Sequence, residues 1–213
     1  MESKTISPEL EQTQKRIVES ASLLFFRKGI RAVTMDDIAH SLKMSKRTLY
    51  EIFSDKEELL RACYESWDAK RNNRVRMLLD KTDNVVEIIL SEILISTEMM
   101  KHISVKFYNE FYRYPSLRDF AVKKSRERHA SAVEFLERGV SQGLILSGID
   151  INVFLQVVSA MGEFVAQSST LCSMEPTTVF RSTFVAYLRG IASEDGRRII
   201  DEFVSRHFTS PKK

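Results

Sequence analysis

Residues 45–51 contain a group of side chains whose chemistry suits the edges of DNA bases. Arg47 can donate two hydrogen bonds to guanine O6 and N7, and Thr48 can offer a hydroxyl to a base edge or a methyl group to thymine. Glu51 can accept from cytosine N4, or it can simply repel phosphate. Three apolar residues of the same segment repeat at helical spacing and predict its buried face: Leu49, Ile52 and Phe53. Arg47, Thr48 and Glu51 are therefore predicted to point outward together as base contacts.

A second group of residues suits the phosphate backbone of DNA. Lys46, Tyr50 and Lys56 lie close in sequence to the predicted base contacts, and the free N–H groups behind Thr34 and Ser45 can bind anions at helix N-termini. The net charge of the chain is +3, yet residues 1–60 contain ten lysines and arginines against ten acidic residues. Bulk charge does not favour DNA binding, so the prediction depends on which face carries the cations.

Capping signals divide the stretch from residue 34 to residue 60 into helices that would hold these side chains. Three such signals are present: Thr34 with Asp37, Ser45, and Ser54 with Glu57. A turn at about residues 42–44 separates the first two helices. Residues 34–53 are thus predicted to form a helix-turn-helix, followed by a long helix that begins near residue 54.

The rest of the chain is also predicted to be helical. Its seven glycines and four prolines fall where apolar periodicity breaks, which indicates an all-α fold of about nine or ten helices. We expect a three-helix DNA-binding domain in residues 1–54, continuous with a larger helical ligand-binding and dimerisation domain in residues 55–209, and a loose tail in residues 210–213. No apolar run is long enough to span a bilayer, and the N-terminus lacks a signal-peptide pattern. We therefore expect a cytoplasmic protein with no membrane partner.

Two apolar groups in the larger domain are candidates for binding. Helices predicted at about residues 151–171 and 177–192 carry more apolar surface than one face needs, and predict a dimer interface: Phe154, Val157, Val158, Met161, Val165, Phe180, Phe184, Tyr187 and Leu188. Methionines and aromatic residues nearer the N-terminus are predicted to line a pocket for a small hydrophobic or aromatic ligand: Met99, Met100, Phe107, Tyr108, Phe111 and Tyr112. The pocket group would equally suit a core, and an ordinary core is also the alternative for the interface group.

An enzyme is the alternative that one motif raises. Residues 139–143 match the G-x-S-x-G pattern of serine hydrolases around Ser141, with Asp150 and His207 downstream. That motif holds its serine on a strand-to-helix turn, whereas residues 132–140 continue a helical apolar stripe, which predicts a helix end with Gly143 as its stop. The two cysteines and four histidines do not cluster at metal-ligand spacing. We expect no catalytic residue, no cofactor and no metal, with a serine hydrolase using Ser141 as a remote alternative.

The residues around the predicted helix-turn-helix resemble the DNA-binding domain of the TetR family of regulators. The matching runs are residues 34–39, 45–50, 53 and 56–59, with Ile17, Ala21, Leu24, Phe25, Lys28 and Gly29 in the leading helix. The resemblance implies a bacterial transcriptional repressor that binds a palindromic operator in double-stranded DNA as a homodimer and is released by a small-molecule effector. It also implies phosphate contacts for Thr34, Lys46, Tyr50 and Lys56, and base contacts for Arg47 and Thr48.

Two positions depart from the family pattern. Lys43 stands where the family usually has a glycine in the turn, a position that tends to need positive φ and would cost a lysine on the order of 1 kcal/mol. Arg47 replaces a residue that is commonly small. Lys43 and the acidic Glu51 also leave a second alternative open, a helical small-molecule-binding or dimeric interaction protein that does not bind DNA.

Overall fold

The computed structural model describes residues 7–100, 102–111 and 113–208, and it confirms the all-α fold. The chain divides into two compact units, and each is described by itself. Unit 1 comprises Met1–Arg71 and His102–Asp119, and unit 2 comprises Asn72–Lys101 and Phe120–Lys213. The boundary predicted at residues 54 and 55 falls within unit 1, because the helix that follows it shares the core of that unit. The predicted division at that point stays a prediction, and the tail at 210–213 lies outside the described residues.

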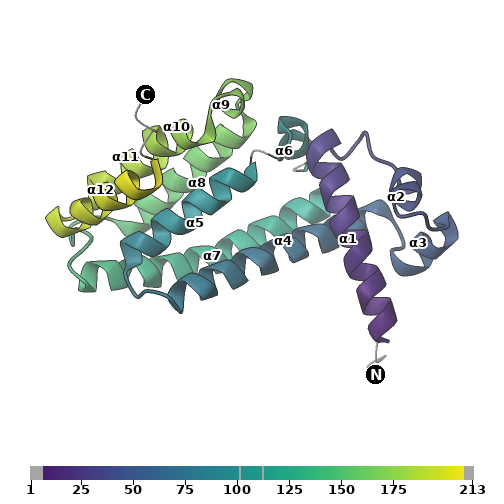
Figure 1. The fold of residues 1–213 in the computed structure, drawn as a ribbon, viewed down its shortest axis with the longest axis horizontal. Helices are drawn as coiled ribbons and strands as arrows, with labels where there is room; N and C mark the ends of the chain where they lie inside the picture. Colours follow the sequence, from purple (N-terminus) through teal and green to yellow (C-terminus); the bar gives the residue numbers. More distant parts are fainter. Residues whose placement is uncertain (1–6, 101, 112, 209–213) are drawn as a thin grey trace. The chain divides into compact units, whose positions relative to one another are not determined.

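Unit 1 is a small helical body around one apolar core. Its elements are α1 (Pro8–Lys28), α2 (Met35–Ser41), α3 (Lys46–Ile52), the first part of α4 (Lys56–Leu79) and α6 (Val105–Phe111). Helix α1 contacts α2 and α6, and α2 contacts α3 (Figure 1). The side chains that are almost fully buried come from every helix of the N-terminal region: Ile17, Phe25, Ile30, Ile38, Leu49, Leu59 and Leu60. Each such side chain stabilises the fold by about 1.5–3 kcal/mol relative to exposure.

Local capping bonds begin the helices of unit 1, largely where the sequence predicted. Thr34 and Asp37 form a reciprocal capping box, and the bonds from Thr34 hold the pKa of the Asp37 carboxyl below its ordinary value. The predicted start of α4 was wrong by one residue. Asp55, rather than Ser54, caps the helix, because its Oδ1 accepts from the backbone N–H groups of both Glu57 and Glu58 at 2.8 Å.

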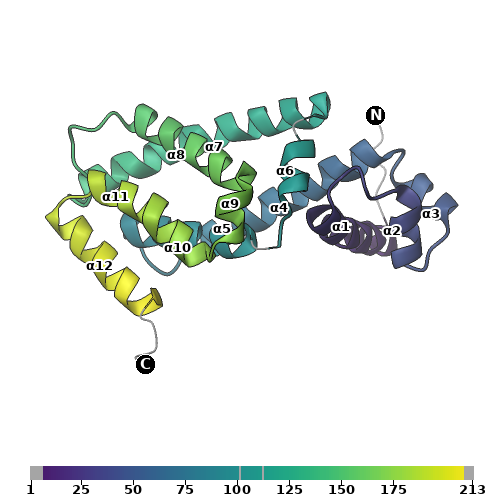
Figure 2. The same ribbon diagram turned by 90° about the horizontal axis from the view of Figure 1, so that it is seen from above.

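Unit 2 is a second helical body around its own apolar core. Its elements are α5 (Val85–Met100), most of α7 (Pro115–Ser141), α8 (Ile151–Gln167), α9 (Ser169–Ser173), α10 (Pro176–Phe180), the π-helical turn η1 (Arg181–Val185), α11 (Ala186–Ile191) and α12 (Glu194–Phe208) (Figure 2). The segments α10, η1 and α11 follow one another without a break and correspond to the single helix predicted there. The helix predicted at 151–171 instead divides at Ser168, whose hydroxyl caps α9 by accepting from the backbone N–H of Leu171.

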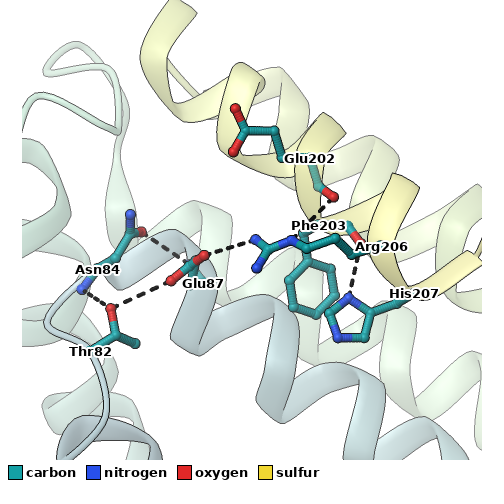
Figure 3. Close-up of polar contacts among 7 residues, drawn as sticks. All are labelled: Thr82, Asn84, Glu87, Glu202, Phe203, Arg206 and His207. Carbon is teal, nitrogen blue, oxygen red and sulfur yellow. Dashed lines mark hydrogen bonds and ion pairs between the residues drawn. The ribbon is translucent and has the colours of Figure 1, made fainter.

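Helix α5 lies at the centre of the contacts in unit 2, where it meets both α10 and α12. Its N-terminal Glu87 is held between two neighbours: Thr82 donates to one carboxylate oxygen, and Arg206 of α12 donates to the other at 2.9 Å (Figure 3). On the same turn of α12, Phe203 is buried and stacks on His207. The bond from Arg206 to Glu87 and the burial of Phe203 in a core that includes residues of α5 therefore hold α12 against α5.

The connection between α7 and α8 approaches the start of α12 closely. Gly143 has φ +71° and ends α7, as predicted. Ile145 forms an isolated antiparallel bridge with Ala192. A Cβ atom at Gly196 would meet the carbonyl oxygen of Leu144, so this position of α12 accepts only glycine without a backbone shift. Among the described residues, no helix is both long and apolar enough to cross a bilayer.

Candidate nucleic-acid interface

Helix α3 presents its polar residues to solvent as predicted. Leu49 is fully buried, whereas the side chains of Lys46, Arg47 and Glu51 are 58%, 90% and 60% exposed. Tyr50 lies on the exposed side as well. Thr48 is half-buried, and its hydroxyl shares a 2.8 Å hydrogen bond with the hydroxyl of Ser45. The short helix thus offers a basic and aromatic outer face on an apolar inner one.

The two cations of this face are paired with acids of the same unit. The Nζ atom of Lys46 lies 2.8 Å from Asp36 on α2, and this bond raises the pKa of Lys46 above its ordinary value. The Nε atom of Arg47 donates to Glu51, one helical turn on, at 2.9 Å. Exposed pairs of this kind contribute little to stability, about 0–1 kcal/mol, so both cations can exchange their partners.

The turn between α2 and α3 has the geometry that its family pattern implies. Lys43 has φ +53° and is the only described residue other than glycine with a positive φ. Its N–H donates to the carbonyl of His40, and the N–H of Met44 donates to that of Ala39. These two bonds define a Schellman motif, in which the residue at Lys43 must adopt the left-handed region. The positive φ predicted at Lys43 is therefore confirmed.

The remaining predicted phosphate contacts lie at helix starts. Thr34 and Ser45 are exposed caps of α2 and α3, and the hydroxyl of each accepts a backbone N–H from its own helix. Lys56 differs, because it is half-buried with its ammonium 5.8 Å from the ring centroid of Phe25. Burial lowers the pKa of Lys56, although Glu110 and Asp37 act in the opposite direction. Its stem covers the core while its charge stays near the surface.

One residue that the sequence did not single out connects α6 to the start of the helix-turn-helix. A carboxylate oxygen of Glu110 accepts from the backbone N–H of Arg31, in the loop between α1 and α2, at 2.8 Å. The backbone N–H of Ser104, just before α6, donates to the carbonyl of Phe26 at 2.7 Å. Arg31 and Glu110 are 79 residues apart, so no local sequence signal could have found this contact.

The residues predicted to line a ligand pocket fall in both units. In unit 1, Phe107 packs edge-on against Phe26 with ring centroids 4.9 Å apart, and the buried Phe111 stacks on Tyr64 at 5.5 Å. Tyr108 is half-buried beside Phe107. Met99 is half-buried on α5 of unit 2. Tyr112 and the side chain of Met100 lie outside what the structure describes. The α6 aromatics thus contribute to the packing of unit 1.

The residues predicted for a dimer interface divide by burial within unit 2. The buried ones are Phe154, Val165, Phe180 and Leu188; Val158, Phe184 and Tyr187 are partly buried against the core of the unit, and Met161 is partly buried as well. Phe154 stacks on Tyr187 with centroids 4.8 Å apart, which shows that α8 turns this side inward. Val157 is exposed, together with two residues that the prediction omitted, Val153 and Phe164. The side chains of the buried group leave almost no surface for another chain.

The serine of the G-x-S-x-G pattern sits at a helix end. Ser141 is the last residue of α7, and its hydroxyl donates to the carbonyl of Glu137 in the preceding turn. This is a helix C-terminus and not the strand-to-helix turn that a nucleophilic serine needs. Within the described parts of the chain, no three residues of the ligating types come together to hold a metal ion.

Known proteins similar to this chain share both the domain and the fold. Residues 17–63 match the domain described as "Bacterial regulatory proteins, tetR family". The HTH-type transcriptional repressor KstR2 of Mycobacterium tuberculosis is 22% identical over 158 residues, which are 72% of this chain and 79% of that protein. Its solved structure, described as a ketosteroid transcriptional regulator, has a TM-score of 0.63 at 20% identity, covering 85% of this chain and 96% of that one.

Two further solved structures extend the likeness in fold. The fatty acid degradation regulator FadR of Bacillus halodurans has a TM-score of 0.70 at 16% identity, with 88% of this chain and 98% of that chain covered. RolR in complex with resorcinol has a TM-score of 0.60 at 18% identity, with 96% and 97% covered. Proteins of this kind regulate transcription and are not enzymes. Residues 17–63 of this chain are therefore a DNA-binding domain of the tetR type with helix-turn-helix geometry, and the chain as a whole shares the fold of these transcriptional regulators.

Proposed function

We propose that this protein is a cytoplasmic repressor that binds a palindromic operator as a homodimer and is released by a small apolar or aromatic molecule. The observation that carries the proposal is the outer face of α3, where Lys46, Arg47 and Tyr50 are exposed while Leu49 is buried. A short helix held in this way suits the major groove of DNA, and capped helix N-termini beside it suit phosphates.

Within this proposal the residues of the interface divide by role. Arg47 and Thr48 contact bases, Glu51 lies beside them on the same face, and Thr34, Ser45, Lys46, Tyr50 and Lys56 contact phosphates. The test is to select duplexes from a random-sequence library with the purified protein and to measure binding of the selected duplex by gel shift. Tyr50→Ala should weaken binding to every sequence, whereas Arg47→Ala should cost about 1–3 kcal/mol and relax one base position. If neither substitution changes binding, the proposed docking face is refuted.

The proposal of a homodimer is supported by the exposed face of α8. Val153, Val157 and Phe164 are 58%, 42% and 67% exposed, and their spacing of four and seven residues puts them on one side of the helix. A row of large apolar side chains on a helix face favours burial against another protein surface. The buried residues of α8, such as Phe154, lie on a different side of the helix. We therefore place the interface on the exposed row of Val153, Val157 and Phe164, together with the partly buried Met161.

A matched pair of substitutions tests the dimer face. Val157→Asp on α8 and Val122→Asp on α7 change residues of equal size and equal exposure, 42% and 43%. Sedimentation velocity should show a monomer for Val157→Asp and a dimer for Val122→Asp, and only the first should lose binding to a two-half-site duplex. Dissociation of both variants, or of neither, would refute this choice of face.

The proposed class of effector is supported by two of the similar structures. RolR was solved with resorcinol, and KstR2 is described as a ketosteroid regulator, which favours apolar or aromatic molecules for this chain too. Which side chains contact the effector stays a prediction. Resorcinol, a steroid ketone and a long-chain fatty acid can each be tested for a rise in melting temperature and for release of the selected duplex. If none of the three has either effect, the proposed effector class is refuted while DNA binding is not.

A further inference from the structure

The ion pair between Arg47 and Glu51 bears on whether Glu51 contacts a base or acts through its neighbour on the outer face of α3. Both residues lie on that helix one turn apart, and the bond joins Arg47 Nε to Glu51 Oε1 at 2.9 Å. Glu51 therefore engages the side edge of the guanidinium. The two terminal nitrogens, Nη1 and Nη2, lie at the other end of the guanidinium and can donate to a base.

We infer that Glu51 is a positioning residue that aims Arg47 at a guanine, and that Glu51 does not itself read a base. Guanine recognition by arginine uses two parallel N–H bonds to O6 and N7. A guanidinium held at Nε can donate both bonds from its terminal nitrogens, so the pair and the base contact can coexist. The inference rests on the proposed function, because it requires α3 to enter a DNA groove.

The high exposure of Arg47 gives a reason for a bond that orients its side chain before DNA binds. At 90% exposure the side chain is not restrained by packing, and a free arginine can turn from a base to a phosphate. Holding it before binding reduces the rotamer freedom lost on binding and favours one orientation. The carboxylate also repels phosphate, which weakens binding to unrelated DNA. Glu51 should thus lower affinity for DNA in general and raise discrimination at one base.

Asp36 provides a matched control on the same surface. It pairs with Lys46 at 2.8 Å, and its side chain is 62% exposed against 60% for Glu51. Asp36→Asn and Glu51→Gln each remove one negative charge beside the proposed groove. Of these two acids, only Glu51 is bonded to Arg47, so a general charge effect would be equal in the two variants, whereas removal of the acceptor in Glu51→Ala would change the guanine preference in addition.

The experiment measures dissociation constants for the selected duplex with each of the four bases at each position, and for an unrelated duplex. Glu51→Ala should reduce the preference for guanine at one position by about 5- to 10-fold, since a bidentate arginine contact contributes about that discrimination or more. It should at the same time strengthen binding to the unrelated duplex. Glu51→Gln should keep most of the guanine preference, because its amide oxygen still accepts from Nε. Asp36→Asn should strengthen binding to the unrelated duplex and leave the guanine preference unchanged.

Several outcomes would overturn the inference. One is a guanine preference that is unchanged in Glu51→Ala. Another is a wild-type protein that shows no guanine preference although Arg47→Ala weakens its binding. A third is a cytosine preference lost in Glu51→Ala and kept in Arg47→Ala, which would make Glu51 a base reader. A fourth is an equal loss of guanine preference in Asp36→Asn. Failure of the wild-type protein to select any duplex would instead refute the proposed function, and melting curves verify that every variant is folded.

Discussion

Replacing Lys43 with glycine should stabilise the protein, in contrast to most glycine substitutions. Lys43 has φ +53° in a turn closed by two Schellman hydrogen bonds, so the backbone demands the left-handed region whatever side chain is present. That conformation costs a residue with a Cβ about 1–2 kcal/mol. Glycine avoids this cost but loses about 0.5–1 kcal/mol more conformational freedom on folding. The expected difference between Lys43→Gly and Lys43→Ala is therefore about 1 kcal/mol in favour of glycine.

The comparison of Lys43→Gly with Lys43→Ala isolates the contribution of the backbone conformation to stability, because both variants remove the same charge. His40, exposed in the last turn of α2, provides the control, since there glycine should be about 1 kcal/mol less stable than alanine. For a chain of this length 1 kcal/mol corresponds to about 2–4 °C in melting temperature. Thermal melts of the four variants should thus show opposite orders at the two positions. If Lys43→Gly melts below Lys43→Ala, the left-handed turn is not what the sequence and the structure indicate.

Three further predictions concern the interior and the C-terminal helix. Gly196→Ala should destabilise the protein by about 1–3 kcal/mol because of the neighbouring carbonyl, whereas Gly148→Ala, with open space around it, should not. Cys63, whose pKa is raised by burial to about 12, should resist iodoacetamide until the chain unfolds, and stability should fall between about pH 9 and 12 as the unfolded thiol ionises first. A double-mutant cycle of Arg206→Ala and Glu87→Ala should give a coupling below about 1 kcal/mol, because the pair is partly exposed.

The helix-turn-helix could be predicted in detail because its signals are local. Capping residues, a three-residue turn and a short apolar stripe all lie within about twenty residues of one another. The burial of Leu49 and the exposure of Arg47 followed from these signals, and the positive φ of Lys43 followed from the resemblance to the TetR family. The one error in this region, Ser54 for Asp55, arose because both residues can cap a helix and only the geometry selects between them.

The face of α8 could not be predicted for the opposite reason. Two apolar rows run along this helix, and periodicity alone does not say which row meets the core. Contacts with distant residues decide it, such as the stacking of Phe154 on Tyr187. The choice leaves Val153 and Phe164 exposed. The hydrogen bond between Arg31 and Glu110 could not be predicted for the same reason, since it joins positions far apart in the chain.

The even charge balance of residues 1–60 takes on a physical meaning in the structure. The acids that offset the cations of α3 are not scattered, because Asp36 is bonded to Lys46 and Glu51 to Arg47. A phosphate that approaches either cation must compete with a carboxylate already in place. The proposed phosphate contact of Lys46 then exchanges one ion pair for another, which reduces the net gain from non-specific DNA. A balanced domain can therefore bind DNA selectively, provided that the correct sequence supplies base contacts in addition to this exchange.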